Sequence, residues 1–220
     1  SVRFQITGTS TEFAWDPSDP VPYGDRANVT FYWGDLDAGI PVNCELGTDT
    51  AITVLSITQP GLDTSDTAIL RIVQGNDVNG YATFFLLLNT SYLNTYATYS
   101  FRITINWTDP GLAPYYEDQI SKLVTITVRM RDTAVPQIVA DPVFYGENAT
   151  ILLKYVDLDN SSELITGSSL TISVLNGLTY DVNPTPVGGF YEVYVVTDGT
   201  GLLGIARINI TITWSGSPFF

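Results

Sequence analysis

The amino-acid sequence predicts an all-β protein made of two tandem β-sandwich domains. Almost every periodic segment alternates apolar and polar residues with period two, and these segments are rich in Val, Ile, Thr and aromatic residues. No segment carries a sustained helical stripe with end caps. A length of 220 residues suits two domains, each large enough to bury a core.

Clusters of Gly, Pro, Asn and Asp separate the predicted strands, which is typical of β-sandwiches. The predicted strands of the first half are Ser1–Thr7, Asn28–Gly34, Ala51–Thr58, Thr67–Val73, Tyr81–Leu88, Tyr99–Trp107 and Leu123–Met130. Those of the second half are Asn148–Val156, Ser169–Leu175, Tyr191–Val196 and Ala206–Trp214.

An internal repeat indicates the number of domains. The Tyr-Gly-Asp sequence at residues 23–25 recurs as Tyr-Gly-Glu at residues 145–147, an offset of 122 residues, and both copies open a strand that ends in Asp-Leu-Asp. A later strand repeats between residues 101–107 and 208–214 at an offset of 107, which we attribute to shorter loops in the second copy. We expect the domain boundary near residues 132–136.

The two copies differ at their ends. The first copy continues beyond Trp107 to a last strand at residues 123–128, whereas no such strand follows Phe219 and Phe220 in the second copy. We therefore predict an N-terminal strand at residues 1–8, a first sandwich domain at 9–133, and a second domain at 134–220 that lacks its final strand.

The N-terminal strand matches the strand that the second domain lacks. At the offset of 122 residues, Val2, Phe4 and Ile6 align without a gap with the alternate apolar residues of the strand at 123–128. We predict that these three residues donate a strand to the open sheet edge of another copy. Phe219 and Phe220 mark the predicted acceptor edge, because their counterparts in the first copy precede the final strand.

Composition excludes several classes of protein. The net charge of -14, from 23 acidic and 9 basic residues, disfavours nucleic acid as a partner. No uninterrupted apolar run approaches the ~20 residues of a membrane helix. The sequence opens with Ser1 and has no signal-peptide pattern, so we expect a mature or excised segment. Cys44 is the sole cysteine, so no disulfide forms within the chain, and we expect this residue to be buried.

Catalytic residues are not apparent in this sequence. There is no His to act as an acid or base or to activate a nucleophile, no Gly-rich phosphate loop, and no Cys/His metal set. A glycosidase-type carboxylate pair stays open as an alternative, but none of the 23 acidic residues stands out for it. We therefore expect a protein that is not an enzyme.

The function of the repeated Asp-Leu-Asp turns has two interpretations. Asp35 and Asp37, with Asp157 and Asp159 in the second copy, could face one oxygen-lined site for Ca²⁺. Alternatively, their carboxylates accept hydrogen bonds from the turn backbone. We favour the turn, since Ca²⁺ needs six to eight oxygen ligands and the motif supplies two or three.

Six Asn-X-Ser/Thr triplets predict N-linked glycans and an extracytoplasmic location. They are Asn28, Asn89, Asn106, Asn148, Asn160 and Asn209.

The Tyr-Gly-Asp/Glu and Asp-Leu-Asp repeat, in an acidic, Thr-rich and Cys-poor chain, resembles the immunoglobulin-like repeats of archaeal cell-surface, S-layer or extracellular filament proteins. The resemblance implies an immunoglobulin-like sandwich and a structural role outside the cell. Its partners would be copies of itself or neighbouring surface repeats. The alternatives are a segment of a long repeat array or adhesin, and a carbohydrate-binding module that uses exposed tyrosines such as Tyr92, Tyr96, Tyr115 and Tyr116.

Overall fold

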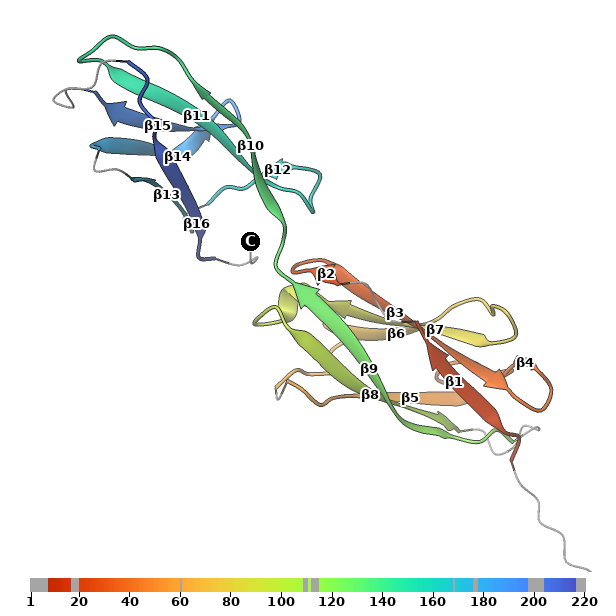
Figure 1. The fold of residues 1–220 in the computed structure, drawn as a ribbon. Coiled ribbons are helices and arrows are strands. Elements are labelled where there is room, and N and C mark those ends of the chain that lie inside the picture. Colours follow the sequence, from red (N-terminus) through yellow and green to blue (C-terminus); the bar gives the residue numbers. More distant parts are fainter. Residues whose placement is uncertain are drawn as a thin grey trace, which may run out of the picture. The chain divides into compact units, whose positions relative to one another are not determined.

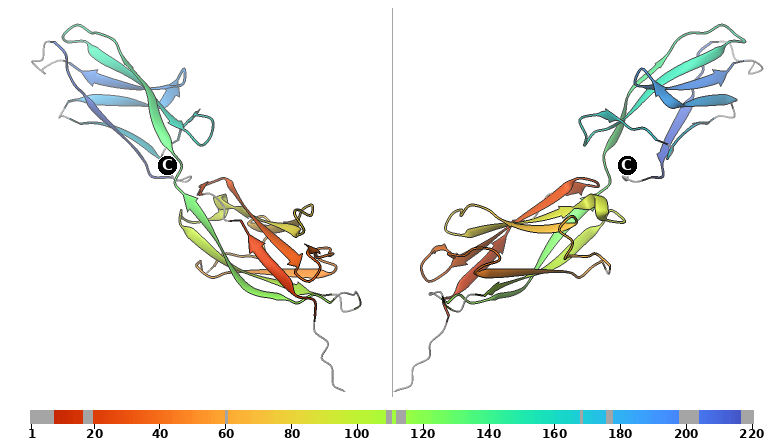
Figure 2. Two further views of the ribbon diagram at one scale, coloured as in Figure 1. Left: turned by 45° about the vertical axis from the view of Figure 1, so that its right-hand side comes forward. Right: turned by 180° about the vertical axis from the view of Figure 1, so that it is seen from behind.

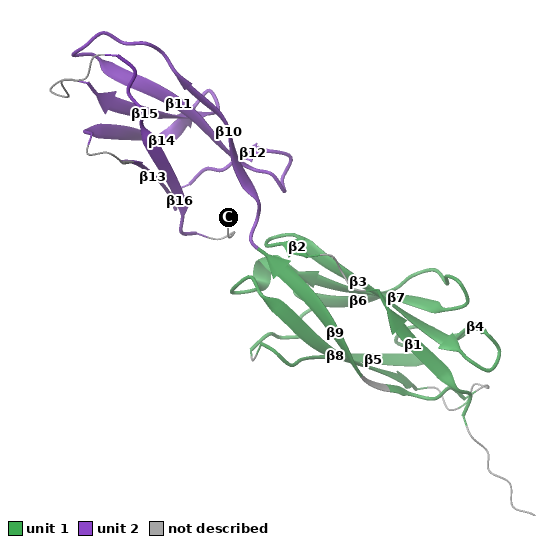
Figure 3. Cartoon of the chain, in the orientation of Figure 1, with its two compact units in different colours: residues 1–129 green, residues 130–220 purple. Residues whose placement is uncertain are grey.

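The computed structural model describes residues 8–16, 20–59, 61–108, 111, 115–167, 169–175, 178–197 and 204–216. Strands dominate these residues, and the helical element among them is one short 3-10 turn, η1 (Thr90–Tyr92). The chain divides into two compact units, Ser1–Arg129 and Met130–Phe220 (Figure 3). The predicted all-β fold is confirmed.

Unit 1 is a sandwich of two sheets (Figure 1). The first sheet has the order β1 (Thr11–Trp15), β3 (Arg26–Asp35), β7 (Ala82–Asn89) and β6 (Leu70–Gln74), with β4 (Ile40–Pro41) paired to β3. The second has the order β2 (Val21–Pro22), β9 (Gln119–Arg129), β8 (Thr98–Trp107) and β5 (Thr50–Ser56). All pairs are antiparallel except β2 with β9, which is parallel. The two sheets have the strand order of the immunoglobulin-like sandwich.

The core of unit 1 forms because alternate residues of facing strands point inward. Phe31 and Trp33 on β3 and Phe84 on β7 have no solvent-exposed surface, and the rings of Phe31 and Phe84 stack 5.4 Å apart. The second sheet closes the core through Phe101 and Ile103 of β8. The buried side chains of β9 complete it: Val124, Ile126 and Val128.

Unit 2 repeats the first sheet and part of the second (Figure 2). Its first sheet has the order β10 (Thr133–Ala140), β11 (Asn148–Asp157), β15 (Phe190–Val196) and β14 (Tyr180–Val187), with β12 (Glu163–Leu164) paired to β11. Its second sheet contains two described strands, β13 (Leu170–Leu175) and β16 (Asn209–Trp214). Within the described residues, unit 2 has no counterpart of β9.

Strand registers agree with the two offsets found in the sequence. Thr11 pairs with Asp35 in unit 1, as Thr133 pairs with Asp157 in unit 2. Each residue of the pair in unit 2 lies 122 residues after its counterpart in unit 1. On the other sheet, Trp107 pairs with β5 at the position where Trp214 pairs with β13, which reproduces the offset of 107.

Ten of the predicted strands have counterparts, whereas β1, β2, β4, β10, β12 and β14 had not been predicted. Thr133 and Pro136 lie within β10, although we had expected the domain boundary there, and the two units meet instead at residues 129 and 130. Between Ala134 and Gln137 the register of β10 shifts, which accommodates the proline on this edge strand. The predicted strand Ser1–Thr7 lies outside the described residues.

Candidate functional site

In unit 1, strand β9 lies between β2 and β8 and joins them into one sheet. Val128 pairs with Val21 of β2, and the N–H of Tyr23 donates to the carbonyl oxygen of Arg129 at 2.9 Å. On its other edge, Ile126 pairs with Tyr99 of β8. The backbone groups of both neighbours are thereby satisfied by β9.

Unit 2 contains both neighbours of this position but, in its described part, no strand between them. Residues 143–145 correspond to β2 and the residue that follows it, and residues 205–208 correspond to the start of β8. Neither segment is in a strand. The described pairing of β16 is with β13 alone.

The start of β8 shows why residues 205–208 do not form a strand. Residues 98–100 pair with β9, and the pairing of β8 with β5 begins only at Phe101. Within the described part of unit 2, no counterpart of β9 lies beside the equivalent residues. β16 therefore begins at Asn209, later than the predicted start at Ala206.

Large apolar side chains are exposed on both sides of the open position. Phe144 is 81% exposed, Tyr145 is 53% exposed and Ile205 is fully exposed. By contrast, Tyr23, which is the counterpart of Tyr145 and adjoins β9 in unit 1, is 4% exposed. Such a patch beside an unpaired sheet edge is typical of an interaction site.

A cleft of about 540 Å³ extends from this patch into unit 2. Its lining includes Phe144, Ile151, Leu178, Val195, Ala206 and Ile208. Ile151 and Val195 belong to the apolar core of the unit, and Leu178 and Ile208 pack against that core. The cleft is thus a continuation of the core, and a suitable apolar side chain entering it would be buried.

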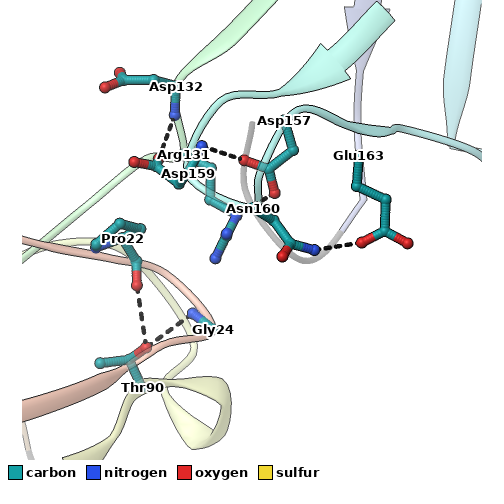
Figure 4. Close-up of polar contacts among 9 residues, drawn as sticks. All are labelled: Pro22, Gly24, Thr90, Arg131, Asp132, Asp157, Asp159, Asn160 and Glu163. Atoms are coloured by element: carbon teal, nitrogen blue, oxygen red, sulfur yellow. Dashed lines mark hydrogen bonds and ion pairs between the residues drawn. The ribbon is translucent and has the colours of Figure 1, made fainter.

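The Tyr-Gly-Asp/Glu repeat positions the segments that lead into this site. Gly24 has a φ of 95°, and its N–H donates to Thr90 Oγ1 at 2.8 Å (Figure 4). Thr90 Oγ1 in turn donates to the carbonyl oxygen of Asp25 at 2.7 Å. In unit 2, the N–H of Gly146 donates to Thr197 Oγ1 at 3.1 Å. A side chain at either glycine would strain this left-handed conformation.

The four aspartates considered as a possible calcium site accept hydrogen bonds from backbone N–H groups. Asp35 Oδ1 accepts from the N–H groups of Asp37 and Ala38, both at 2.9 Å, and Asp37 Oδ2 accepts from the N–H of Ser10 at 3.0 Å. The favoured interpretation of these residues as turn acceptors fits these contacts. Among the described residues there is no group of three or more Asp, Glu, His or Cys side chains that could hold a metal ion.

Two of these contacts recur in unit 2, where an ion pair is added (Figure 4). Asp157 Oδ1 accepts from the N–H of Asp159 at 3.0 Å, and Asp159 Oδ2 accepts from the N–H of Asp132 at 2.7 Å. In addition, Arg131 Nε donates to Asp157 Oδ2 at 2.6 Å, with both side chains less than a tenth exposed. The position equivalent to Arg131 in unit 1 is Thr9. These contacts attach the start of β10 to the end of β11.

The exposed tyrosines do not form a single platform. Tyr92 and Tyr96 are exposed and precede β8, whereas Tyr115 is exposed and follows it, so they lie near opposite ends of that strand. The expectation that Tyr116 is exposed is wrong: its ring packs 5.0 Å from that of Trp107, and burial raises its pKa. Phe219 and Phe220 lie outside the described residues, as do Val2, Phe4 and Ile6.

Cys44 is half-buried, and burial raises the pKa of its thiol, which disfavours the reactive thiolate. The six predicted glycosylation sites differ in exposure. Those with exposed side chains are Asn28, Asn148, Asn160 and Asn209. Asn89 and Asn106 are half-buried. Asn160 already donates through Nδ2 to Glu163 Oε2 (Figure 4).

No helix in the described part of the chain is long and apolar enough to cross a membrane. No family model and no curated protein matches the chain. Among solved structures, one similar chain is from the Escherichia coli adhesin FdeC, with 16% identity and a TM-score of 0.33 over 98% of this chain and 62% of the adhesin chain. Another is a marsupial T cell receptor, with 12% identity and a TM-score of 0.37 over 98% of this chain and 100% of the other. The chain thus spans less than two thirds of the adhesin chain.

Proposed function

We propose that this chain is a non-enzymatic structural protein of a cell surface or extracellular filament. In this proposal, residues 1–7 of one copy form the missing strand of unit 2 in the next copy. The observation that supports it is the open sheet edge beside β16, which adjoins an apolar cleft, in a chain that also carries a sequence resembling β9 at its N-terminus.

The N-terminal segment has the alternation that this position requires. Val2, Phe4 and Ile6 would face the core, while the intervening residues Arg3 and Gln5 would face solvent. Their equivalents on β9 follow the same pattern, because Val124, Ile126 and Val128 are buried. Burying three such side chains contributes roughly 1.5–3 kcal/mol each before ordering costs.

The link from the N-terminal segment to β1 has the same length as the link from β9 to β10. Three residues separate β9 of unit 1 from β10 of unit 2, and the N–H of Asp132 donates to Asp159 of the Asp-Leu-Asp turn. In unit 1, Ser10 is attached to its turn in the same way. A donated strand ending at residue 7 would therefore enter β1 through a linker of the same length. Each junction between copies would resemble the junction within a copy.

A second candidate is a segment of a long surface repeat array or adhesin. There the preceding domain would be covalently attached, and residues 1–7 would be its final strand. The same open edge favours this candidate, since it needs the same strand from a neighbour. A carbohydrate-binding role is less favoured, because Tyr92 and Tyr115 lie near opposite ends of β8. In each case we expect N-linked glycans at exposed sites such as Asn28 and Asn148, and a location outside the cell.

Deleting residues 1–7 tests the proposal. We expect the full chain to form linear oligomers in light scattering, and the deletion variant to be monomeric with a unit 2 that unfolds at a lower temperature. A peptide of residues 1–9 should bind the deletion variant one to one and restore its stability, because it supplies the missing strand.

Two substituted peptides provide the control. Replacing Val2, Phe4 and Ile6 by Ser should abolish binding, whereas replacing the solvent-facing Arg3 and Gln5 by Ser should preserve it. A monomeric full chain with a stable unit 2, or a deletion variant that still assembles, would rule out donation between copies.

A further inference from the structure

Unit 1 and unit 2 differ at one position of the strand-acceptor site. In unit 1, Tyr99 of β8 lies opposite Ile126 of β9, and both side chains are fully buried. The residue of unit 2 that corresponds to Tyr99 is Ala206, and it is exposed and lines the 540 Å³ cleft. A large side chain of unit 1 is therefore replaced by a methyl group.

The opposite change occurs on the donor side. The residue aligned with Ile126 in the N-terminal segment is Phe4. Applying both offsets to the observed pair of Tyr99 and Ile126 places Phe4 opposite Ala206. Neighbouring donor positions change less, because Val2 aligns with Val124 and Ile6 with Val128. Compared with the pair in unit 1, the acceptor residue is therefore smaller and the donor residue is larger.

We infer that Ala206 and Phe4 form a size-complementary pair that decides which strand completes unit 2. This inference rests on the proposed strand donation and adds its specificity. The occupant is the N-terminal segment of a second copy. Its Phe4 ring fills the part of the unit 2 cleft that corresponds to the space of the Tyr99 ring in unit 1. Close packing makes such a site sensitive to both missing and excess volume.

The pair makes the two acceptor positions non-interchangeable. A segment carrying Phe4 would be overpacked beside Tyr99 in unit 1. A β9-like strand would place Ile beside Ala206 and leave a cavity in unit 2. Exchange of β9 between copies is therefore disfavoured, and assembly proceeds head to tail.

One neighbouring pair works against donation rather than for it. In the same register Arg3 lies opposite Arg207, as Thr125 lies opposite Ser100 in unit 1. Like charges directly opposite on a sheet destabilise pairing. The selectivity is thus carried by the core-facing pair of Phe4 and Ala206.

The inference is tested by changing the size of the side chain at position 206 of the acceptor and at position 4 of the donor peptide. The acceptor is the chain without residues 1–7, with Ala206 or with Ala206→Phe, and the ligands are peptides of residues 1–9 with Phe4 or with Phe4→Ile. We expect the Ala206 acceptor to prefer the Phe4 peptide by about tenfold or more, and the Ala206→Phe acceptor to prefer the Phe4→Ile peptide. Thr211→Phe, on the solvent-facing side of β16, should leave the wild-type preference unchanged.

The outcomes separate this inference from the proposed function. If both acceptors bind both peptides but share the same order of preference, the size-complementary pair is wrong while strand donation stands. If no peptide binds either acceptor and the full chain is monomeric, strand donation itself is wrong. Should Ala206→Phe fail to fold as a free acceptor, the same comparison is made by appending each peptide sequence after Phe220 and measuring the melting temperature of unit 2.

Discussion

A copy of Lys122–Met130, joined after Phe220 through a short linker, is expected to convert the chain into a stable monomer when residues 1–7 are also removed. The added strand would run antiparallel to β16, as β9 does to β8. It would cover Ala206 and Ile208 and pair with the edge that is open in unit 2.

The stabilisation should be large. Burial of the three core-facing side chains of the copy is worth several kcal/mol after ordering costs and after the cost of the cavity that Ile leaves beside Ala206. For a domain of this size, that corresponds to a rise in the melting temperature of unit 2 by about 10–20 °C. Calorimetry resolves the two units as separate transitions if they unfold independently, and only the transition of unit 2 should move.

The control is a copy in which the three residues equivalent to Val124, Ile126 and Val128 are replaced by Ser. It should leave the chain with an open edge and no gain in stability. A monomer that is equally stable with the Ser copy, or a capped chain that still polymerises, would contradict strand complementation of unit 2.

Arg131→Met in the capped monomer is expected to destabilise unit 2 by about 3 kcal/mol, because it leaves the buried carboxylate of Asp157 without its cation. Arg131 and Asp157 are each less than a tenth exposed, and their contact is 2.6 Å long. Denaturant unfolding of the capped monomer with and without Arg131→Met would measure the difference in the free energy of unfolding.

Asp157→Asn provides the matched comparison for this prediction. The amide oxygen can still accept from the N–H of Asp159, as Asp157 Oδ1 does, but carries no charge. Combining it with Arg131→Met should recover most of the lost stability, since both charges are then removed. Equal losses in the single and the double variant would show that packing of the Arg131 stem, and not the charge pair, stabilises this turn.

Much of the fold could be predicted because the repeat in the sequence is also a repeat in register. The offset of 122 residues recurs in the pairs Thr11 with Asp35 and Thr133 with Asp157. Strands with regular alternation, such as β3 and β8, were found with ends shifted by one or two residues.

The strands that the sequence did not reveal have irregular patterns. β14 contains Pro184 and Pro186, and its register shifts between Asn183 and Val187. β10 contains Pro136 next to a similar shift. Both are edge strands, where a missing N–H is tolerated, so proline did not mark a boundary as we had expected.

The site was predictable in outline but not in detail. The comparison of the two copies predicted that the second domain lacks a final strand, and the described residues of unit 2 contain no counterpart of β9. The absence of a strand at residues 205–208 was not predicted, because the alternation of these residues predicts one, and no described strand of unit 2 lies where β9 lies in unit 1. Burial of Tyr116 likewise depends on ring contacts with Trp107 and with Trp33, and Trp33 is distant in sequence.

The most direct test of strand donation is a disulfide that forms only between the predicted partners. In unit 1, the hydroxyl oxygens of Thr98 and Thr127 lie 3.1 Å apart on adjacent strands. The equivalent pair is Ile205 in unit 2 and Gln5 in the donor segment.

We therefore predict that Gln5→Cys with Ile205→Cys, in a chain carrying Cys44→Ser, oxidises to a ladder of covalent multimers on a non-reducing denaturing gel. Mixing the two single variants should give covalent dimers that contain one of each. Shifting the first cysteine to Phe4 should reduce the yield, because that side chain faces the opposite side of the strand. Disulfides formed exclusively within one chain, or no crosslinking while Ile205→Cys remains accessible to a thiol reagent, would contradict strand donation from one copy to the next.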